Sequence, residues 1–346
     1  MYIVPLNTNS QKSKNINYGL EILRMIMSFW VVLNHCYKTK NGILNNIIFG
    51  HRFHVPTFII MSFFFFYNNL SLNNINKIKS RLEKLFLPYL IYPTFIWLIN
   101  YILHIKSNQI SLGIYYKKLL KQFLIGRGVY GVLWFHFNLI FLTILFYILS
   151  SIFNQHYLLI LQILAIISYI IQYSDFNYNF FNKYPHNIKF SVGYLAEIFP
   201  LAVTGLTFAS LNLITKMRQF RLKTMFFSII LIFILFKYNI FTLIKGFGKQ
   251  GIMLNIGSLQ FFIFFYLLPI EKINNSNILL FFKYITNFTA GIYFLHILIY
   301  KILKNYIILV FKQTLLGCII IYIVCYLICF LSYKRFKNTK LKYLFI

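Results

Sequence analysis

Long apolar stretches alternate with short polar segments along almost the whole chain. About ten of them approach the length of roughly 20 residues that an α-helix needs to cross the hydrocarbon core of a bilayer. They are residues 17–37, 55–72, 85–105, 133–153, 157–172, 191–213, 224–241, 251–270, 286–309 and 312–333. The fifth is short and lysines interrupt the ninth, so nine or eleven spans are alternatives. The pattern predicts an all-α, polytopic integral membrane protein with about ten transmembrane helices.

Composition supports this class and argues against a soluble domain. Of the 346 residues, 59% are hydrophobic and only 11% are charged, and the mean hydropathy is +0.69. Soluble domains carry about 25% charged residues, so a water-facing surface cannot be built from so few. The first apolar stretch carries charges and lacks a small-residue cleavage pattern, so we expect a spanning helix there and not a signal peptide.

The chain is strongly basic, with 34 Lys and Arg against five acidic residues and a formal charge of +29. Nucleic acid is the first partner that such a balance suggests. The basic residues are scattered between apolar stretches without a recognition motif. We therefore exclude nucleic acid and expect the lipid bilayer, with its anionic headgroups, as the partner; part of the surplus can also attract a phosphorylated cofactor.

Basic residues also indicate orientation, because cytoplasmic loops are usually enriched in them. The numbers of Lys and Arg residues in the inner and outer loops are nearly equal. The long loops 106–132 and 173–190 contribute basic residues that weaken the difference between the two sides. The short basic flanks 77–84, 216–223 and 334–337 all fall inside when the N-terminus is inside. We therefore expect a protein of the bacterial plasma membrane with both ends, 1–16 and 334–346, as basic, loosely ordered cytoplasmic tails.

The four cysteines lie in or beside the expected spans and lack the CxxC spacing of a metal site. They are Cys36, Cys318, Cys325 and Cys329. This placement predicts apolar packing residues, with neither a disulfide nor a metal site.

The first apolar stretch, LEILRMIMSFWVVLNHC, holds three ionisable side chains at membrane depth, where each costs a few kcal/mol. On a helix, Arg24 and His35 return to within about 20° of one face, and Glu21 lies within about 40° of His35. Arg24 and His35 are separated by roughly 16 Å along the axis, so they can line one elongated polar cavity but cannot form a hydrogen bond. An alternative stays open, in which Glu21 and Arg24 form an interfacial i,i+3 pair and His35 lies at the opposite headgroup level.

This stretch resembles the first span of the integral membrane acyltransferases of acyltransferase family 3, and the resemblance extends over most of the chain. Its strongest element is an arginine and a histidine separated by ten residues, here Arg24 and His35. Four further elements follow in the family's order: HVPTFIIMSFFFF, SRLEKLFLPYL, VLWFHFNLIF and TAGIYFLHILIY. The family's usual Ser-Gly is Ser62-Phe63 here, which predicts the loss of a close helix approach. Lys84 stands where the family often has arginine, and it keeps the charge without the bidentate fork.

The resemblance implies that residues 17–333 form a transmembrane acyltransferase domain. Such enzymes transfer an acyl group, commonly acetyl from acetyl-CoA, to a hydroxyl of a cell-envelope polysaccharide or lipid-linked saccharide. A histidine can take the hydroxyl proton during attack on the thioester without a metal or a permanently bound cofactor. We assign this role to His35, with Glu21 as a second catalytic candidate. No GxSxG elbow is present and Cys36 projects about 100° from His35, which favours direct transfer over a covalent acyl-enzyme.

Two further groups of site residues are expected. Arg24, Arg81 and Lys84 lie near the inner membrane face in this topology and are expected to bind the phosphates of acyl-CoA. For Arg81 and Lys84, ordinary flanking charge is an equal alternative. Candidates for substrate binding are Trp134, Glu197, Tyr293 and His296. The alternatives are an interfacial aromatic belt for Trp134, a structural carboxylate at Glu197 and an interhelical hydrogen bond at His296.

A different class of function also fits the intramembrane charges. In a secondary transporter or exporter of a saccharide or an anion, Glu21, Arg24, His35 and Glu197 would be substrate or proton sites. Such folds often contain two similar halves with broken helices in corresponding places. The sequence shows no such internal symmetry, which favours the acyltransferase interpretation.

Overall fold

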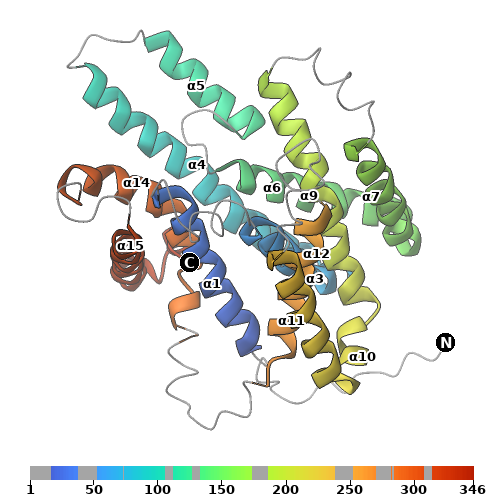
Figure 1. Cartoon of the computed structure of the whole chain (residues 1–346). Coiled ribbons are helices and arrows are strands. Elements are labelled where there is room, and N and C mark those ends of the chain that lie inside the picture. Colours follow the sequence, from blue (N-terminus) through green and yellow to red (C-terminus); the bar gives the residue numbers. More distant parts are fainter. Residues whose placement is uncertain are drawn as a thin grey trace.

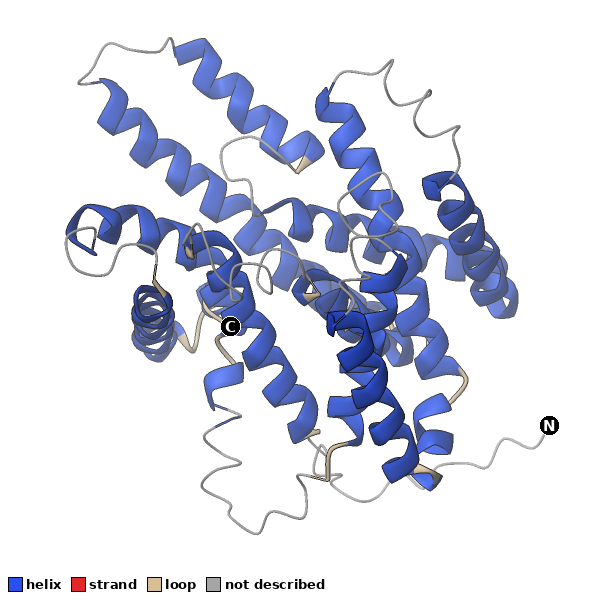
Figure 2. Cartoon of the chain, viewed as in Figure 1, coloured by secondary structure: helices blue, strands red, loops and turns tan. Residues whose placement is uncertain are grey.

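The computed structural model describes residues 17–37, 53–72, 74–105, 112–126, 133–173, 186–237, 252–269, 282, 284–307 and 314–346. Within these ranges it contains helices, turns and loops and no strand (Figure 2). The expected all-α fold is therefore confirmed for the described part of the chain. The α-helices are α1 (Tyr18–Cys36), α3 (His54–Ser71), α4 (Ile75–Ile105), α5 (Leu112–Ile125), α6 (Trp134–Phe153), α7 (Tyr157–Tyr173), α9 (His186–Ser210), α10 (Leu213–Gln219), α11 (Arg221–Lys237), α12 (Ile252–Leu267), α14 (Thr289–Ile307) and α15 (Leu315–Phe336). Two short 3-10 helices are η2 (Asn154–His156) and η5 (Lys340–Leu344).

Every apolar stretch expected from the sequence overlaps a helix, but fewer of these helices qualify as membrane spans. Three described stretches are long and apolar enough to cross a bilayer: Ile75–Ile99, Trp134–Ile171 and Leu315–Phe336. Three further helical stretches are apolar but shorter: Leu195–Ser210, Leu254–Leu267 and Thr289–Leu303. The structure thus supports an all-helical membrane protein and does not confirm ten transmembrane helices.

Helix α5 was not expected, because residues 106–132 had been assigned to a loop. It runs antiparallel to the second half of α4 (Figure 1). The Tyr89 hydroxyl donates to the Phe123 carbonyl at 3.2 Å, and the rings of Trp97 and Tyr116 lie 5.2 Å apart. Gln122 is buried, while the three lysines of this helix are exposed. Its 14 residues include three lysines, so the segment does not have the uncharged apolar pattern by which the other helices were predicted.

Helix α3 lies at the centre of the bundle, where it packs against α9, α12, α6, α4 and α1. Its closest approach is to α9, because a Cβ atom added at Gly205 would lie 2.5 Å from the Ile60 carbonyl oxygen. The glycine that permits this contact therefore comes from α9 and not from the position of Phe63. Phe63 is itself fully buried, with its ring 5.2 Å from that of Phe146 on α6. The close approach that a glycine at position 63 would permit stays a prediction, and the close contact of α3 with α9 is made through Gly205.

Helix α1 is inserted between α14 and α15 on one side and α3 and α12 on the other (Figure 1). Asn17 caps its first turn by accepting from the Leu20 amide at 3.1 Å, and donates to the Tyr266 carbonyl of α12 at 3.0 Å. Ser28, 1% exposed, lies 2.9 Å from the hydroxyl of Tyr322 on α15. These contacts fix both the depth and the rotation of the helix that carries Glu21, Arg24 and His35.

The C-terminal residues are ordered, which corrects the expectation of a loose tail at 334–346. Helix α15 continues to Phe336, and η5 then folds back along α4. The Tyr92 hydroxyl donates to the Leu344 carbonyl at 2.8 Å, and Lys340 pairs with Glu83 at 3.2 Å. A buried hydrogen bond and the apolar Leu344 side chain hold this segment, so its basic composition did not predict its order. The other expected tail, residues 1–16, lies outside the described residues.

All four cysteines are buried in the main apolar core, as a packing role predicts. Cys36 comes from α1, and the other three lie along one side of α15. No three His, Cys, Asp or Glu side chains of the described residues gather as metal ligands would.

Candidate active site

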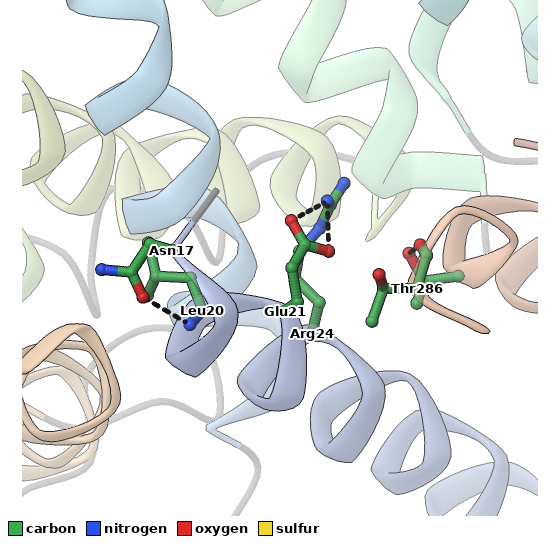
Figure 3. Close-up of polar contacts among 6 residues, drawn as sticks. Asn17, Leu20, Glu21, Arg24 and Thr286 are labelled. Carbon is green, nitrogen blue, oxygen red and sulfur yellow. Dashed lines mark hydrogen bonds and ion pairs between the residues drawn. The ribbon is translucent and has the colours of Figure 1, made fainter. Parts of the chain in front are cut away.

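The acidic and basic residues at the start of α1 form an ion pair. Both carboxylate oxygens of Glu21 accept from one terminal nitrogen of Arg24 at 3.2 Å (Figure 3). The Arg24 side chain is 42% exposed and that of Glu21 is 20% exposed. Glu21 therefore orients the guanidinium, and at roughly 21 Å along the axis it is not brought to His35.

Arg24 lines a cavity of about 340 Å³ that is bounded by α1, α3, α4, α6 and α14. A second arginine, Arg81 of α4, lines the same cavity. The other polar residues in its wall are Ser62, His136, Thr289 and Tyr293. The rest of the wall is apolar and is dominated by Phe58, Phe65 and Phe135. Two guanidinium groups in a largely apolar cavity favour an amphipathic ligand with anionic groups.

Arg81 is held in place by neutral groups of two other helices. Its Nε donates to Thr143 Oγ1 at 3.1 Å, and its terminal nitrogens donate to the Ser62 carbonyl at 3.3 Å and to Ser62 Oγ at 2.8 Å. Its guanidinium carbon lies 4.6 Å from the centroid of the Phe66 ring and 5.2 Å from that of Phe63. Neither ion pair formed among the described residues involves Arg81. Its charge is thus fixed in position and meets no carboxylate in that part of the chain.

Lys84 differs from Arg81 in its surroundings, although the two residues are only three positions apart on α4. It is exposed and is not in the cavity wall. Its ammonium group lies 5.6 Å from the centroid of the Tyr343 ring, in the C-terminal segment. Arg24 and Arg81 therefore share one cavity, and Lys84 lies outside its wall.

His35, at the end of α1, is exposed and neighbours a buried histidine of α14. The ring centroids of His35 and His296 are 5.1 Å apart, although 261 positions separate the two residues in the sequence. His296 is completely buried, and its Nδ1 lies 3.2 Å from the Ile292 carbonyl oxygen. Both Arg24 and His35 thus face α14, in agreement with the shared face derived from helical periodicity.

A row of rings connects the cavity with His35. His136 and Tyr293, both in the cavity wall, have ring centroids 5.5 Å apart. The Tyr293 ring is 6.1 Å from that of His296, which in turn neighbours His35. The arrangement places two cations at one end of a row of neighbouring rings and a histidine pair at the other.

The remaining predicted residues lie outside this row of rings. Trp134 begins α6 and is half-buried, one residue before the cavity-lining Phe135. Glu197 is 1% exposed on α9 and is not in the cavity wall, and the ion-pair partner of Arg24 is Glu21.

Sequence reasoning did not single out Thr289 and gave no weight to the cavity-facing role of His136. Thr289 stands four positions before Tyr293 on α14, so the two share a helical face. The four-residue spacing from Tyr293 is the feature of the sequence that could have identified Thr289 as a site residue.

Comparison with known families agrees with this geometry. The model of acyltransferase family 3, described as an acyltransferase domain, matches residues 17–334, nearly the whole chain. No curated protein and no solved structure matches the chain. The family resemblance drawn from five sequence elements is therefore confirmed.

Proposed function

Because the chain belongs to acyltransferase family 3 and is a membrane acyltransferase, we propose that it moves acetyl from acetyl-CoA to a hydroxyl of the cell envelope. The acceptor class that we propose is a polysaccharide or a lipid-linked saccharide. The protein would act in the bacterial plasma membrane, with acyl-CoA arriving from the cytoplasm.

One observation carries this proposal: the arginine cavity and the His35 end of α1 are joined by neighbouring rings. The phosphates of CoA carry several negative charges, and the thioester stands far from them at the end of a flexible arm. Arg24 and Arg81 would bind the phosphates, and the separation of roughly 16 Å between Arg24 and His35 leaves room for the arm.

The two arginines have different parts in donor binding. Arg81 already has its hydrogen bonds to Ser62 and Thr143, which hold the guanidinium in one orientation. Such preorganisation lowers the entropy cost of binding an anion. Arg24 is more exposed and only one of its terminal nitrogens is bonded to Glu21, so its other N–H groups are proposed to contact the ligand. Lys84 would contribute long-range attraction from outside the cavity.

His35 would be the general base of the reaction. As the acceptor oxygen attacks the thioester carbonyl carbon, its proton passes to a bare ring nitrogen of His35. The carbon–sulfur bond then breaks, and the proton neutralises the departing CoA thiolate. The exposed position of His35 suits a large acceptor, and the half-buried ring of Trp134 is a candidate for stacking on a sugar face.

The proposal is tested by measuring ester-linked acetyl groups on envelope saccharides from cells with and without the protein. Wild-type protein should add ester-linked acetyl, and labelled acetyl-CoA should supply the label in isolated membranes. Cys36→Ala is the matched control, because it changes the neighbour of His35 in a buried position without touching the proposed base. It should retain transfer. Identical saccharides in both strains, together with no label transfer, would contradict the proposed function.

A further inference from the structure

The ring of His296 neighbours that of the proposed base, and one of its ring nitrogens is buried without a hydrogen-bond partner among the described residues. A carbonyl oxygen only accepts hydrogen bonds, so the contact of Nδ1 with the Ile292 carbonyl requires the proton of His296 to be on Nδ1. Its Nε2 is then a bare acceptor. This nitrogen is buried and has no hydrogen-bond partner among the described residues. A buried acceptor without a partner is costly, by about 1–3 kcal/mol in general, and such groups often have a functional role.

The imidazole of His35 on α1 neighbours the ring that carries this acceptor. The 5.1 Å separation of the ring centroids, with planes tilted by 42°, brings the edges of the two rings close together. His35 is exposed, whereas the buried ring of His296 is held by its contact with the Ile292 carbonyl. A hydrogen bond from a His35 N–H to His296 Nε2 would fill the empty acceptor position.

We infer that His296 is a positioning residue for His35, and that it accepts a hydrogen bond from one ring nitrogen of His35 so that the other nitrogen is left bare as the base. This inference rests on the proposed function and extends it. In a neutral imidazole only one nitrogen carries the proton, so fixing the donor nitrogen also fixes which nitrogen receives the substrate proton. His296 acts on catalysis through His35 and needs no contact with the substrate.

The same contact stabilises the charge that forms during the reaction. When the hydroxyl proton moves to His35, the ring becomes an imidazolium with two N–H donors. His296 Nε2 keeps accepting from the N–H that it already bonds, and that hydrogen bond becomes stronger because hydrogen bonds to charged groups are stronger than those between neutral groups. His296 gains and loses no proton itself, so the proton received by His35 still leaves with the thiolate.

The first test compares variants of His296 in the full-length protein. His296→Leu removes the acceptor and should lower kcat by about 10- to 100-fold, with the KM for acetyl-CoA nearly unchanged. His296→Gln places an amide oxygen near the position of Nε2 and should restore most of kcat. His296→Asn ends one bond earlier, near the position of Nδ1, and should stay low. Equal rates for the Gln and Asn variants would overturn the inference, even if the Leu variant does not fold.

The second test measures coupling with His35. In a His35→Ala background the acceptor has nothing to position, so adding His296→Leu should lower the residual rate by less than about 3-fold. His136→Leu is the matched control, because His136 is also a buried histidine and its ring neighbours Tyr293. It should lower the rate by the same factor in both backgrounds. A purely structural His296 would behave as this control does.

The two proposals fail in different ways. Absence of transfer by the wild-type protein would contradict the proposed function. Wild-type transfer with a fully active His296→Leu variant, or with additive effects of the His35 and His296 changes, would contradict only the positioning role.

Discussion

Arg81 holds a positive charge in a place where three neutral oxygens and two aromatic rings surround it. A flanking residue that only marks the cytoplasmic side would not need such fixed surroundings, since any exposed cation serves that purpose. Lys84, three residues later, shows the contrast because it is exposed. The two residues looked equivalent in the sequence and differ in the structure.

We therefore expect Arg81→Ala to weaken acetyl-CoA binding by roughly tenfold or more, since a charge-assisted contact is worth about 1.5–3 kcal/mol. Arg81→Lys should also lose binding, because an ammonium group cannot replace the planar fork that reaches Ser62 and Thr143 together. Equilibrium binding of acetyl-CoA to the purified protein measures both changes.

Lys84→Ala is the matched control for these variants, with an expected loss below about threefold because an exposed charge outside the cavity is screened by solvent. If Arg81→Ala and Lys84→Ala weakened acetyl-CoA binding equally, the cavity would not be the donor-binding site.

For individual residues, the sequence predicted the contacts within one helix and missed the contacts between helices. Periodicity placed Glu21, Arg24 and His35 on one face, because the geometry of a single helix fixes that relation. It could not pair His35 with His296, nor Arg81 with Ser62 and Thr143. Those contacts depend on which helices become neighbours, and a hydrophobic pattern does not encode this choice.

Among the helices, the contact of α3 with α9 is the most sensitive to a small change. A methyl group at Gly205 would overlap the backbone of Ile60, and backbone cannot move aside as a flexible side chain can. Gly205→Ala should therefore lower the stability by about 1–3 kcal/mol. Thermal unfolding of the purified protein in detergent measures this loss.

Gly113 in α5 supplies the control, because nothing lies within 4 Å of the Cβ atom that a substitution would add. Gly113→Ala should leave the unfolding temperature unchanged or slightly raised, since alanine favours a helix. A Gly205→Ala protein as stable as wild type would show that α3 and α9 are not packed so closely.

The helices themselves were predictable to the extent that they are apolar. All ten expected stretches overlap helices, because length and hydropathy determine them. Helix α5 was missed because its buried face is narrow and lysines occupy much of the rest. The docked segment η5 was missed for a related reason: a tyrosine, a carbonyl and one leucine hold it, and none of these forms a periodic pattern.

For the whole molecule, the direction of the helices bears on the topology. Arg24 shares a cavity with Thr289 near the start of α14, while His35 neighbours His296 farther along that helix. Helices α1 and α14 thus run in the same direction, as the first and ninth of ten alternating spans would. Helix α5 has 14 residues and is about 21 Å long, which is too short to cross the hydrocarbon core.

We expect both ends of the chain to lie in the cytoplasm. Reporters of membrane sidedness placed at Thr8 and after Ile346 test this, the second beyond the docked C-terminal segment so that its contacts with α4 are kept. Reporters on opposite sides of the membrane would contradict an even number of spans.

The central claim is that His35 takes the proton of the acceptor during acyl transfer, and the most direct measurement is the transfer rate of the His35→Gln protein. Glutamine keeps a polar side chain of similar reach, so the fold and acetyl-CoA binding should be preserved, but an amide cannot accept the proton. We predict a transfer rate about 10²- to 10⁴-fold below that of wild type, measured with labelled acetyl-CoA and an envelope saccharide acceptor. A well-folded His35→Gln protein that acylates its acceptor at nearly the wild-type rate would contradict this account.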